Sequence, residues 1–221
     1  MSHPVSNKNE TIRLFKNPVL EYFSHIHPLV PVLIFTPIIA FFLYRGFVLF
    51  SLPFFLFAVL AGYLIWLLLE YALHRFGFHY KPSSDRGKRM IFLVHGIHHD
   101  YPRDSTRLVM PLLVSFPLAI TFFFLFKALF GASYPPFFGG LVLGYLMYDC
   151  THYASHHFQT KNRFLMAVKS HHLRHHYHDP ESGFGLSNPL WDYVFGTNFK
   201  TSLPAQEDAA LLTRESVNET T

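Results

Sequence analysis

Two long and almost uncharged stretches constrain the fold of this chain more than any other feature of its sequence. Residues 28–73 contain two charged side chains, Arg45 and Glu70, and residues 108–148 contain one, Lys127. A membrane-spanning helix needs about 20 consecutive apolar residues. The stretches are 46 and 41 residues long, so each can hold two spans joined by a tight turn.

Turn-forming residues divide each stretch in two. The first breaks around residues 44–46 or at residues 51–53, and the second breaks at the Gly- and Pro-containing residues 131–136. We therefore predict an all-α integral membrane protein with four transmembrane helices arranged as two hairpins. The expected spans cover about residues 28–49, 53–74, 108–130 and 135–156. A soluble protein with a wholly buried helical core is the alternative, but the segments are too long for it.

The positions of Lys and Arg predict the orientation of the spans, because basic residues accumulate on the cytoplasmic side. Of the 18 Lys and Arg residues, 16 lie in the N-terminal segment, the loop between the two hairpins or the C-terminal segment. Only Arg45 and Lys127 lie at the opposite end of the spans, near the turns within the hairpins. Both termini and the central loop are therefore expected in the cytoplasm, at an endoplasmic reticulum or bacterial inner membrane. Asn-x-Thr sequons at residues 9–11 and 218–220 would face the cytosol, and we interpret them as chance matches.

The chain then divides into three parts. Residues 1–17 form a cytoplasmic N-terminal segment without a visible removable signal peptide. Residues 18–200 form the membrane domain, which ends in a helical cap on the cytoplasmic side. Residues 201–221 are expected to be a loose polar tail.

Composition excludes several other classes. An apolar content of 50% excludes a disordered chain. One cysteine excludes an internal disulfide scaffold and a multi-cysteine zinc finger. The formal charge of +4 is too small to indicate a nucleic-acid partner.

Histidine is unusually abundant, with 16 residues. Thirteen of them fall into four clusters that the predicted topology brings to the cytoplasmic ends of the spans. The clusters are residues 74–79 (HRFGFH), 95–99 (HGIHH), 152–157 (HYASHH) and 171–178 (HHLRHHYH). Neutral imidazoles gathered in such numbers would each need a partner, and imidazole suits iron, zinc or copper. The clusters therefore indicate a metal site, and their size indicates more than one ion.

The spacing within the clusters supports this interpretation. On a helix, residues i, i+3 and i+4 share a face, so each H-x2-H-H box is expected to point its three side chains together. His74 and His79 are five residues apart, and both reach one site only if the helix ends between them, which Gly77 would allow. The expected ligands are His74, His79, His95, His98, His99, His152, His156, His172, His175 and His176.

The remaining six histidines do not fit the spacing patterns of the expected ligands. His157, His171 and His178 are surplus, and His3, His25 and His27 stand alone as surface or interfacial residues. Cys150 is expected to be a small packing residue.

Carboxylates near the clusters are expected to accept the second N–H of a metal-ligating imidazole. Glu70 lies one turn before His74, and Asp149 lies three residues before His152. Further acids flank the second and fourth clusters, with an ordinary ion pair such as Asp104 with Arg107 as the alternative. These further acids are Asp100, Asp104, Asp179 and Glu181.

The four histidine patterns, in this order between paired hydrophobic hairpins, resemble the membrane fatty acid hydroxylase and desaturase superfamily. Over about residues 18–197 the chain is most similar to its fatty acid 2-hydroxylase branch. The segments that carry this resemblance are residues 71–79 (YALHRFGFH), 95–99 (HGIHH), 107–111 (RLVMP), 144–153 (GYLMYDCTHY), 183–185 (GFG) and 190–197 (LWDYVFGT).

The resemblance implies a mono-oxygenase that places a hydroxyl group on C2 of a fatty acyl chain, either free or within a ceramide-type lipid. It implies the same ten histidines as ligands of two metal ions, with O2 and an external reductant as co-substrates. Tyr145, Tyr148 and Asp149 match positions near the family's substrate entrance. Iron is expected for activity, because zinc has no redox chemistry, although a purified preparation could contain zinc.

Many relatives carry a fused cytochrome b5 domain with a His-Pro-Gly-Gly haem motif. Here His27 and Pro28 are followed by Leu29 and Val30. A separate donor of the cytochrome b5 or ferredoxin type is therefore expected.

Other functions remain open at this point. A sterol or carotenoid hydroxylase, or an acyl desaturase, would use similar clusters. A metal transporter would place its site near the middle of the membrane, and a zinc hydrolase would need only three protein ligands.

Overall fold

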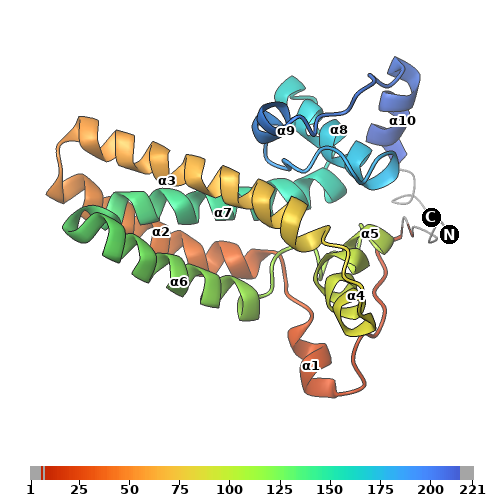
Figure 1. Cartoon of the computed structure of the whole chain (residues 1–221), viewed down its shortest axis with the longest axis horizontal. Helices are drawn as coiled ribbons and strands as arrows, with labels where there is room; N and C mark the ends of the chain where they lie inside the picture. Colours follow the sequence, from red (N-terminus) through yellow and green to blue (C-terminus); the bar gives the residue numbers. More distant parts are fainter. Residues whose placement is uncertain (1–5, 7, 215–221) are drawn as a thin grey trace.

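The computed structural model describes residue 6 and residues 8–214, and every regular element within these residues is helical (Figure 1). In chain order the elements are α1 (Pro18–Phe23), α2 (Leu29–Leu49), α3 (Leu52–Ala72), η1 (Leu73–Phe78), α4 (Asp85–Ile91), η2 (Phe92–Gly96), α5 (Ile97–Asp100), α6 (Leu112–Phe130), η3 (Gly131–Ser133), α7 (Tyr134–His157), α8 (Arg163–Tyr177), α9 (Leu190–Phe195) and α10 (Ala205–Arg214). His3 and the sequon at residues 218–220 lie outside the described residues.

The four longest helices form two hairpins that lie side by side (Figure 1). The first turns at Ser51, whose extended backbone precedes a first helical turn that contains a proline. The second turns at Gly131, which has φ of 53°, a conformation that a residue without Cβ adopts at little cost. Both turns lie within the breaks expected from the sequence.

Within the described part of the chain, three helical stretches are long and apolar enough to cross a membrane, namely residues 29–49, 52–78 and 112–157. The third stretch contains both α6 and α7, which fold back on each other at η3. Helix α6 begins at Leu112 rather than near residue 108, because Pro111 has an extended backbone and precedes the first helical turn. The second stretch continues past residue 74 through η1.

Helix α7 is the centre of the bundle and packs most closely on α3. A Cβ atom at Gly62 of α3 would lie 2.0 Å from the carbonyl oxygen of Phe137. A Cβ atom at Gly140 of α7 would lie 2.1 Å from the carbonyl oxygen of Val59. Small residues at these positions let two helix backbones approach closely, as is common between membrane helices.

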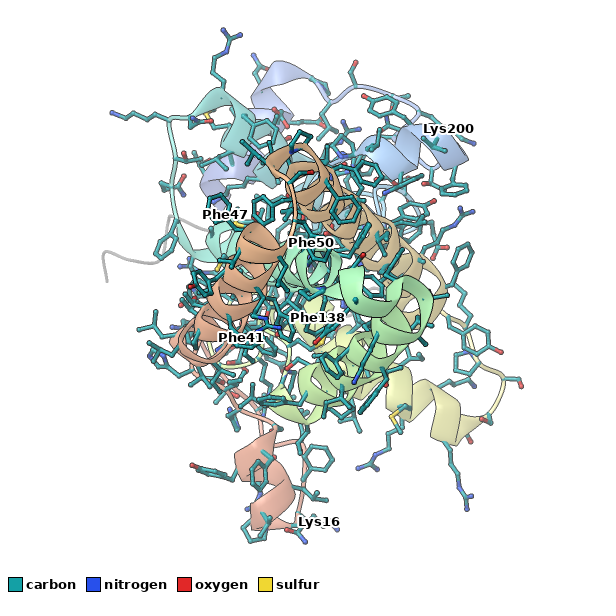
Figure 2. All side chains as sticks on the ribbon, turned by 90° about the vertical axis from the view of Figure 1, so that its left-hand side faces the viewer. Lys16, Phe41, Phe47, Phe50, Phe138 and Lys200 are labelled. Atoms are coloured by element: carbon teal, nitrogen blue, oxygen red, sulfur yellow. The ribbon has the colours of Figure 1, made fainter. Side chains whose placement is uncertain are left out.

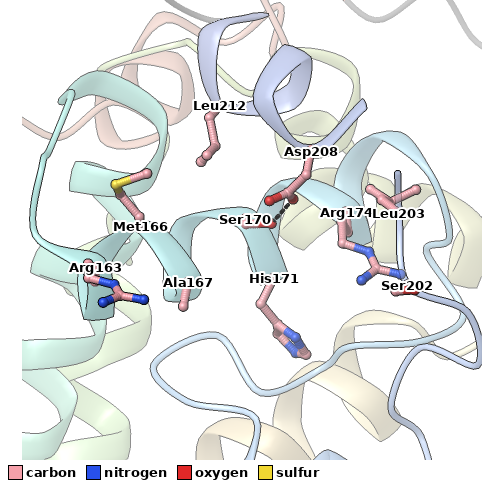
Figure 3. A pocket seen from close by; sticks show the side chains of 10 residues that line it. All are labelled: Arg163, Met166, Ala167, Ser170, His171, Arg174, Ser202, Leu203, Asp208 and Leu212. Atoms are coloured by element: carbon pink, nitrogen blue, oxygen red, sulfur yellow. Dashed lines mark hydrogen bonds between the residues drawn. The ribbon is translucent and has the colours of Figure 1, made fainter. Parts of the chain in front are cut away.

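The shorter helices gather at one end of the bundle, opposite the two hairpin turns (Figure 1). This end contains η1, α4, η2, α5, α8, α9 and α10. The expected loose tail is wrong for residues 205–214, which form helix α10. Leu212 of α10 lines a cleft of about 480 Å³ with Met166 of α8, and Asp208 accepts a hydrogen bond from the Ser170 hydroxyl (Figure 3). Helix α10 is therefore held against α8.

Candidate metal centre

Ten histidines meet at the cap end of the bundle in two groups of five. Within each group, one ring nitrogen from every member lies within 4.8 Å of those of the others. The first group contains His74, His79, His95, His99 and His175, and the second contains His98, His152, His156, His172 and His176. These are the ten histidines that the sequence patterns selected.

The expectation that all three members of an H-x2-H-H box point together is wrong. His95 and His99 belong to the first group, whereas His98 belongs to the second. Residues i and i+4 lie above one another on a helix, while adjacent residues point about 100° apart. The neighbours His98 and His99 therefore face different groups, and the box from residues 172 to 176 divides in the same way.

His74 and His79 reach one group without an end to the helix between them. Residues 73–78 form a π-helical turn, in which the His79 backbone N–H donates to the His74 carbonyl oxygen at 3.0 Å. This i to i+5 hydrogen bond brings residues five apart onto one face. Gly77 lies inside this turn, so its expected role as a helix end is wrong.

The ring nitrogens within each group face one another at hydrogen-bond distance. In the first group the Nε2 atoms of His74 and His99 lie 3.1 and 3.0 Å from that of His95. In the second group the Nε2 atoms of His152 and His98 are 2.7 Å apart. Burial lowers the pKa of His79 to about 4, although Glu181 acts in the opposite direction. Burial also lowers the pKa values of His95, His98 and His172 well below the ordinary value. Neutral imidazole nitrogens that converge in this way suit a metal ion.

Backbone carbonyls fix which nitrogen is available in two of these rings. The Nδ1 atom of His74 lies 2.7 Å from the Phe184 carbonyl oxygen, and that of His175 lies 2.8 Å from the Ser182 carbonyl oxygen. A carbonyl only accepts, so each Nδ1 carries the proton and each Nε2 presents its lone pair to the group. Metal-ligating histidines are commonly oriented by such contacts, and these rings fit that requirement.

The two carbonyl groups belong to the turn at residues 182–185. Asp192 of α9, which the sequence analysis did not identify, holds this turn in place. Its carboxylate accepts from the backbone N–H groups of Phe184 and Gly185, both at 2.8 Å, and from the Thr197 hydroxyl. The Asp192 side chain is completely buried. A lone acid within the apolar helix Leu190–Phe195 was the signal that could have identified it.

Glu70 and Asp149 do not bond to the histidines that precede or follow them, so their expected direct contacts are wrong. Glu70 accepts from the backbone N–H and the hydroxyl of Ser187, both at 2.6 Å. Asp149 accepts from the Met110 backbone N–H at 3.2 Å. Each carboxylate fixes a loop that borders the histidines.

Of the other acids near the clusters, two form ion pairs and a third accepts a backbone hydrogen bond. Asp104 pairs with Arg107, as the alternative interpretation expected, and Glu181 pairs with Lys81. Asp179 accepts the backbone N–H of Glu181.

The surplus histidines belong to neither group. His157 stacks on Tyr153, His171 lies 3.2 Å from Asp192, and His178 is exposed. His25 and His27 also lie outside both groups, as expected, and His25 contacts Glu21.

Cys150 is exposed and is therefore not a packing residue. It lies next to the buried Asp149 on α7, and adjacent residues of a helix point in different directions.

An apolar cavity of about 150 Å³ borders both histidine groups. Tyr148 lines it and packs against His152, and Met110, which Asp149 holds, lines it as well. Tyr145 lies deeper in the bundle, against Phe35 and Trp66. Of the three residues expected near a substrate entrance, Tyr148 therefore borders the cavity directly. The other apolar lining residues are Phe78, Leu93, Val94, Leu108, Val109, Pro111 and Val114.

A family model described as fatty acid hydroxylase matches residues 59–197 of the chain. This range includes all ten grouped histidines, Asp192 and the residues that line the cavity.

Named relatives come from plants, mammals and yeast. The chain is 43% identical over 158 residues to a dihydroceramide fatty acyl 2-hydroxylase of Arabidopsis thaliana, covering 71% of this chain and 67% of that protein. A fatty acid 2-hydroxylase of Rattus norvegicus is 43% identical over 141 residues, covering 62% of this chain. A second Arabidopsis relative is matched over 58% of its length, and the rat protein over 38%, so the chain spans only part of these proteins.

A solved structure described as full-length scs7p, in which only the hydroxylase domain is visible, has a similar fold. The two structures superpose with a TM-score of 0.79 at 34% sequence identity, covering 86% of this chain and 73% of that chain.

Proposed function

The chain belongs to the fatty acid hydroxylase family, and from this premise we propose that it is a membrane mono-oxygenase that hydroxylates C2 of a fatty acyl chain. The acyl chain is that of a free fatty acid or of a ceramide-type lipid, and the reaction consumes O2 and external electrons. The observation that carries the proposal is the apolar cavity that borders both groups of five histidines. The names of the relatives support the same reaction class.

We assign two metal ions to the two histidine groups, one ion to each. Bound iron supplies the O2 activation and one-electron chemistry that attack on an unactivated C–H bond requires, whereas zinc has no redox role. The convergence of the ring nitrogens within each group supports this assignment. A zinc-loaded preparation is expected to be folded and inactive.

The protein's own residues position the acyl chain and exclude water. The lining of the cavity is mostly apolar, so burying the methylene groups nearest C2 there is favourable, at about 0.8 kcal/mol for each methylene. Tyr148 is the candidate to contact the substrate near its carbonyl group. Asp149 and Tyr145 are positioning residues, since Asp149 holds the Met110 backbone and Tyr145 packs below the cavity.

We propose that α2, α3, α6 and α7 each span the membrane, with the histidine-bearing cap and both termini on the cytoplasmic side. Lys and Arg support this orientation, since Arg45 and Lys127 alone lie near the hairpin turns. The cap would then face a cytoplasmic electron donor of the cytochrome b5 or ferredoxin type. A bilayer of the endoplasmic reticulum or a bacterial inner membrane fits the length of the helices.

The test is expression in a host that lacks 2-hydroxy lipids, followed by mass spectrometry of free fatty acids and ceramides. A 2-hydroxy acyl product supports the proposal, and the pool in which it appears identifies the substrate. A new double bond, or an oxidised sterol or carotenoid, identifies one of the related enzymes instead. Metal uptake without any lipid product favours a transporter.

Two variants complete this experiment. His98→Ala removes a member of the second group and is expected to abolish the product. His178→Ala changes an exposed histidine outside both groups and is expected to retain it. Equal activity in the two variants contradicts the assignment of the metal centre.

A further inference from the structure

Helix α1 (Pro18–Phe23) lies beside the bundle rather than within it. Figure 1 shows α1 at the cap end, near the level at which α6 begins, and the perpendicular view in Figure 2 shows it projecting sideways beyond the long helices, with Lys16 at its outer end. A bilayer around the four long helices would have its surface at this level. The helix is therefore placed where the cytoplasmic leaflet meets water.

Most side chains of α1 are apolar and exposed. Val19 is 59% exposed, Leu20 52%, Tyr22 76% and Phe23 49%. Four exposed large apolar residues within a six-residue helix form an unfavourable surface in water. Short segments of this kind are stabilised when their apolar side chains enter the boundary between lipid headgroups and acyl chains.

A basic cleft adjoins this apolar surface. The cleft has a volume of about 690 Å³ and lies between α4 and the segment that leads into α1. Among the described residues, its lining contains three cationic side chains and no carboxylate. The lining residues are Arg13, Leu14, Phe15, Lys16, Asn17, Leu20 and Arg89.

The cations of the cleft are available to an anionic partner. The Arg13 guanidinium donates to the carbonyl oxygens of Phe15 and Lys16, both at 2.9 Å, which holds its charge at the cleft without neutralising it. The two carboxylates on the adjoining helices already have partners. Glu21 accepts from the Arg107 guanidinium and from the backbone N–H groups of Leu14 and Phe15, and Asp85 pairs with Lys88.

We propose that α1, residues 13–17 and Arg89 form a binding site for an anionic phospholipid of the cytoplasmic leaflet. The exposed side chains of α1 enter the leaflet, and the cations of the cleft bind the headgroup phosphate and carboxylate. Basic residues close to a membrane surface attract anionic lipids in this way. The site lies outside the proposed catalytic reaction and depends only on the proposed position of the bundle in the bilayer.

The site is joined to the cavity beside the histidines. Glu21 of α1 accepts from the Arg107 guanidinium at 2.8 Å, and the Arg107 side chain is only 5% exposed. Arg107 itself lines the cavity. Seating α1 on the leaflet therefore fixes the height of the cavity relative to the membrane surface.

The test measures which lipid lies next to α1 in the full chain. Tyr22→Cys in a Cys150→Ser background provides one attachment point for a fluorophore, since the chain has a single cysteine. The labelled protein is placed in phosphatidylcholine nanodiscs that contain equal fractions of brominated phosphatidylserine or brominated phosphatidylcholine. Phosphatidylserine is expected to quench more strongly, and each cation neutralised should reduce this preference about fivefold.

The matched variants carry equal changes of charge. Arg13→Gln, Lys16→Gln and Arg89→Gln together are expected to remove the preference, while Lys161→Gln, Arg163→Gln and Lys200→Gln retain it. The second set is exposed, and Figure 2 shows Lys200 at the opposite edge of the molecule from Lys16. If the first triple variant does not fold, Arg89→Gln alone and a salt titration of the wild-type protein give the same comparison.

Three results overturn the proposal. Equal quenching by both lipids excludes an anionic headgroup site. No quenching by either lipid shows that α1 is not in the leaflet. Loss of the preference on adding inorganic phosphate at constant ionic strength identifies a site for free phosphate. The readout does not involve hydroxylation, so an inactive protein with an intact lipid preference would contradict only the proposed function.

Discussion

The direction in which each histidine points decides to which metal-binding group it belongs. His98 and His99 are adjacent in sequence, yet they belong to different groups, whereas His95 and His99 belong to the same one. A short helix that passes between two sites contributes ligands to both, because neighbouring side chains diverge while residues four apart align. The spacing of the box therefore suits the two metal ions that we propose, one for each group, rather than a single ion.

Metal content measures this division directly. His98→Ala and His99→Ala each remove one member from a different group, so each is expected to lower bound metal from about two ions per chain toward one. The double variant should retain little metal. Elemental analysis of purified protein, with exposed His178→Ala as the control, gives the answer, and unchanged content in both single variants contradicts the two-group assignment.

A second residue-scale prediction concerns Glu21, whose carboxylate belongs to neither of the two histidine groups. Burial raises its pKa, but hydrogen bonds from the backbone N–H groups of Phe15 and Leu14, together with His25 and Arg107, lower the pKa to about 2. Because the folded pKa is below the ordinary value of 4.5, the carboxylate stabilises the fold above pH 4.5. That contribution is lost as the pH falls from 4.5 toward 2.

Glu21→Gln is therefore expected to lower the melting temperature at pH 7 by roughly 2–4 °C, with the difference shrinking below pH 4.5. Thermal unfolding in detergent across this pH range measures the effect. Glu207→Gln, at an exposed position on α10, serves as the control. A difference that is constant with pH would show that the charge of Glu21 is not responsible.

At the scale of elements, the turn at residues 182–185 acts as a support for the first histidine group. Its carbonyl oxygens contact His74 and His175, and Asp192 of α9 holds its backbone N–H groups. An amide side chain at position 192 would turn its own N–H group toward the backbone N–H groups of Phe184 and Gly185, and two donors cannot form a hydrogen bond with each other. Asp192→Asn is expected to weaken metal binding about 10–100-fold, the usual cost of losing such a contact.

Competition with a chelator measures that affinity, and Asp179→Asn is a suitable control. The Asp179 side chain accepts from the Glu181 backbone N–H in the same region. Equal metal affinity in both variants would show that Asp192 supports the fold without orienting the histidines.

The contact between α3 and α7 gives a prediction about packing. A Cβ atom at Gly140 would lie 2.1 Å from the Val59 backbone oxygen, whereas one at Gly77 would meet nothing within 4 Å. Gly140→Ala is therefore expected to cost roughly 1–3 kcal/mol, and Gly77→Ala should be neutral or slightly stabilising. Thermal unfolding of the two variants in detergent provides the comparison, and equal melting temperatures contradict the close packing.

At the scale of the whole molecule, apolar length and turn residues were sufficient to predict the helical hairpins. Histidine spacing was sufficient to select the ten grouped residues. Sequence spacing did not predict the π-helical turn at residues 73–78, because a helix of ordinary geometry was assumed. It also missed Asp192 and helix α10, since both depend on contacts with segments distant in the chain. Local patterns therefore identified the chemistry, and tertiary contacts determined its arrangement.

The central claim is that the paired histidine groups direct oxygen from O2 to C2 of an acyl chain. The most direct test supplies iron-loaded protein, an electron donor and ¹⁸O2 with an acyl substrate that carries two deuterium atoms on C2. The expected product is a 2-hydroxy acyl chain that contains one ¹⁸O atom and has lost one deuterium, and zinc-loaded protein is expected to form none. Oxygen from water, a hydroxyl group at another carbon, or a double bond would contradict it.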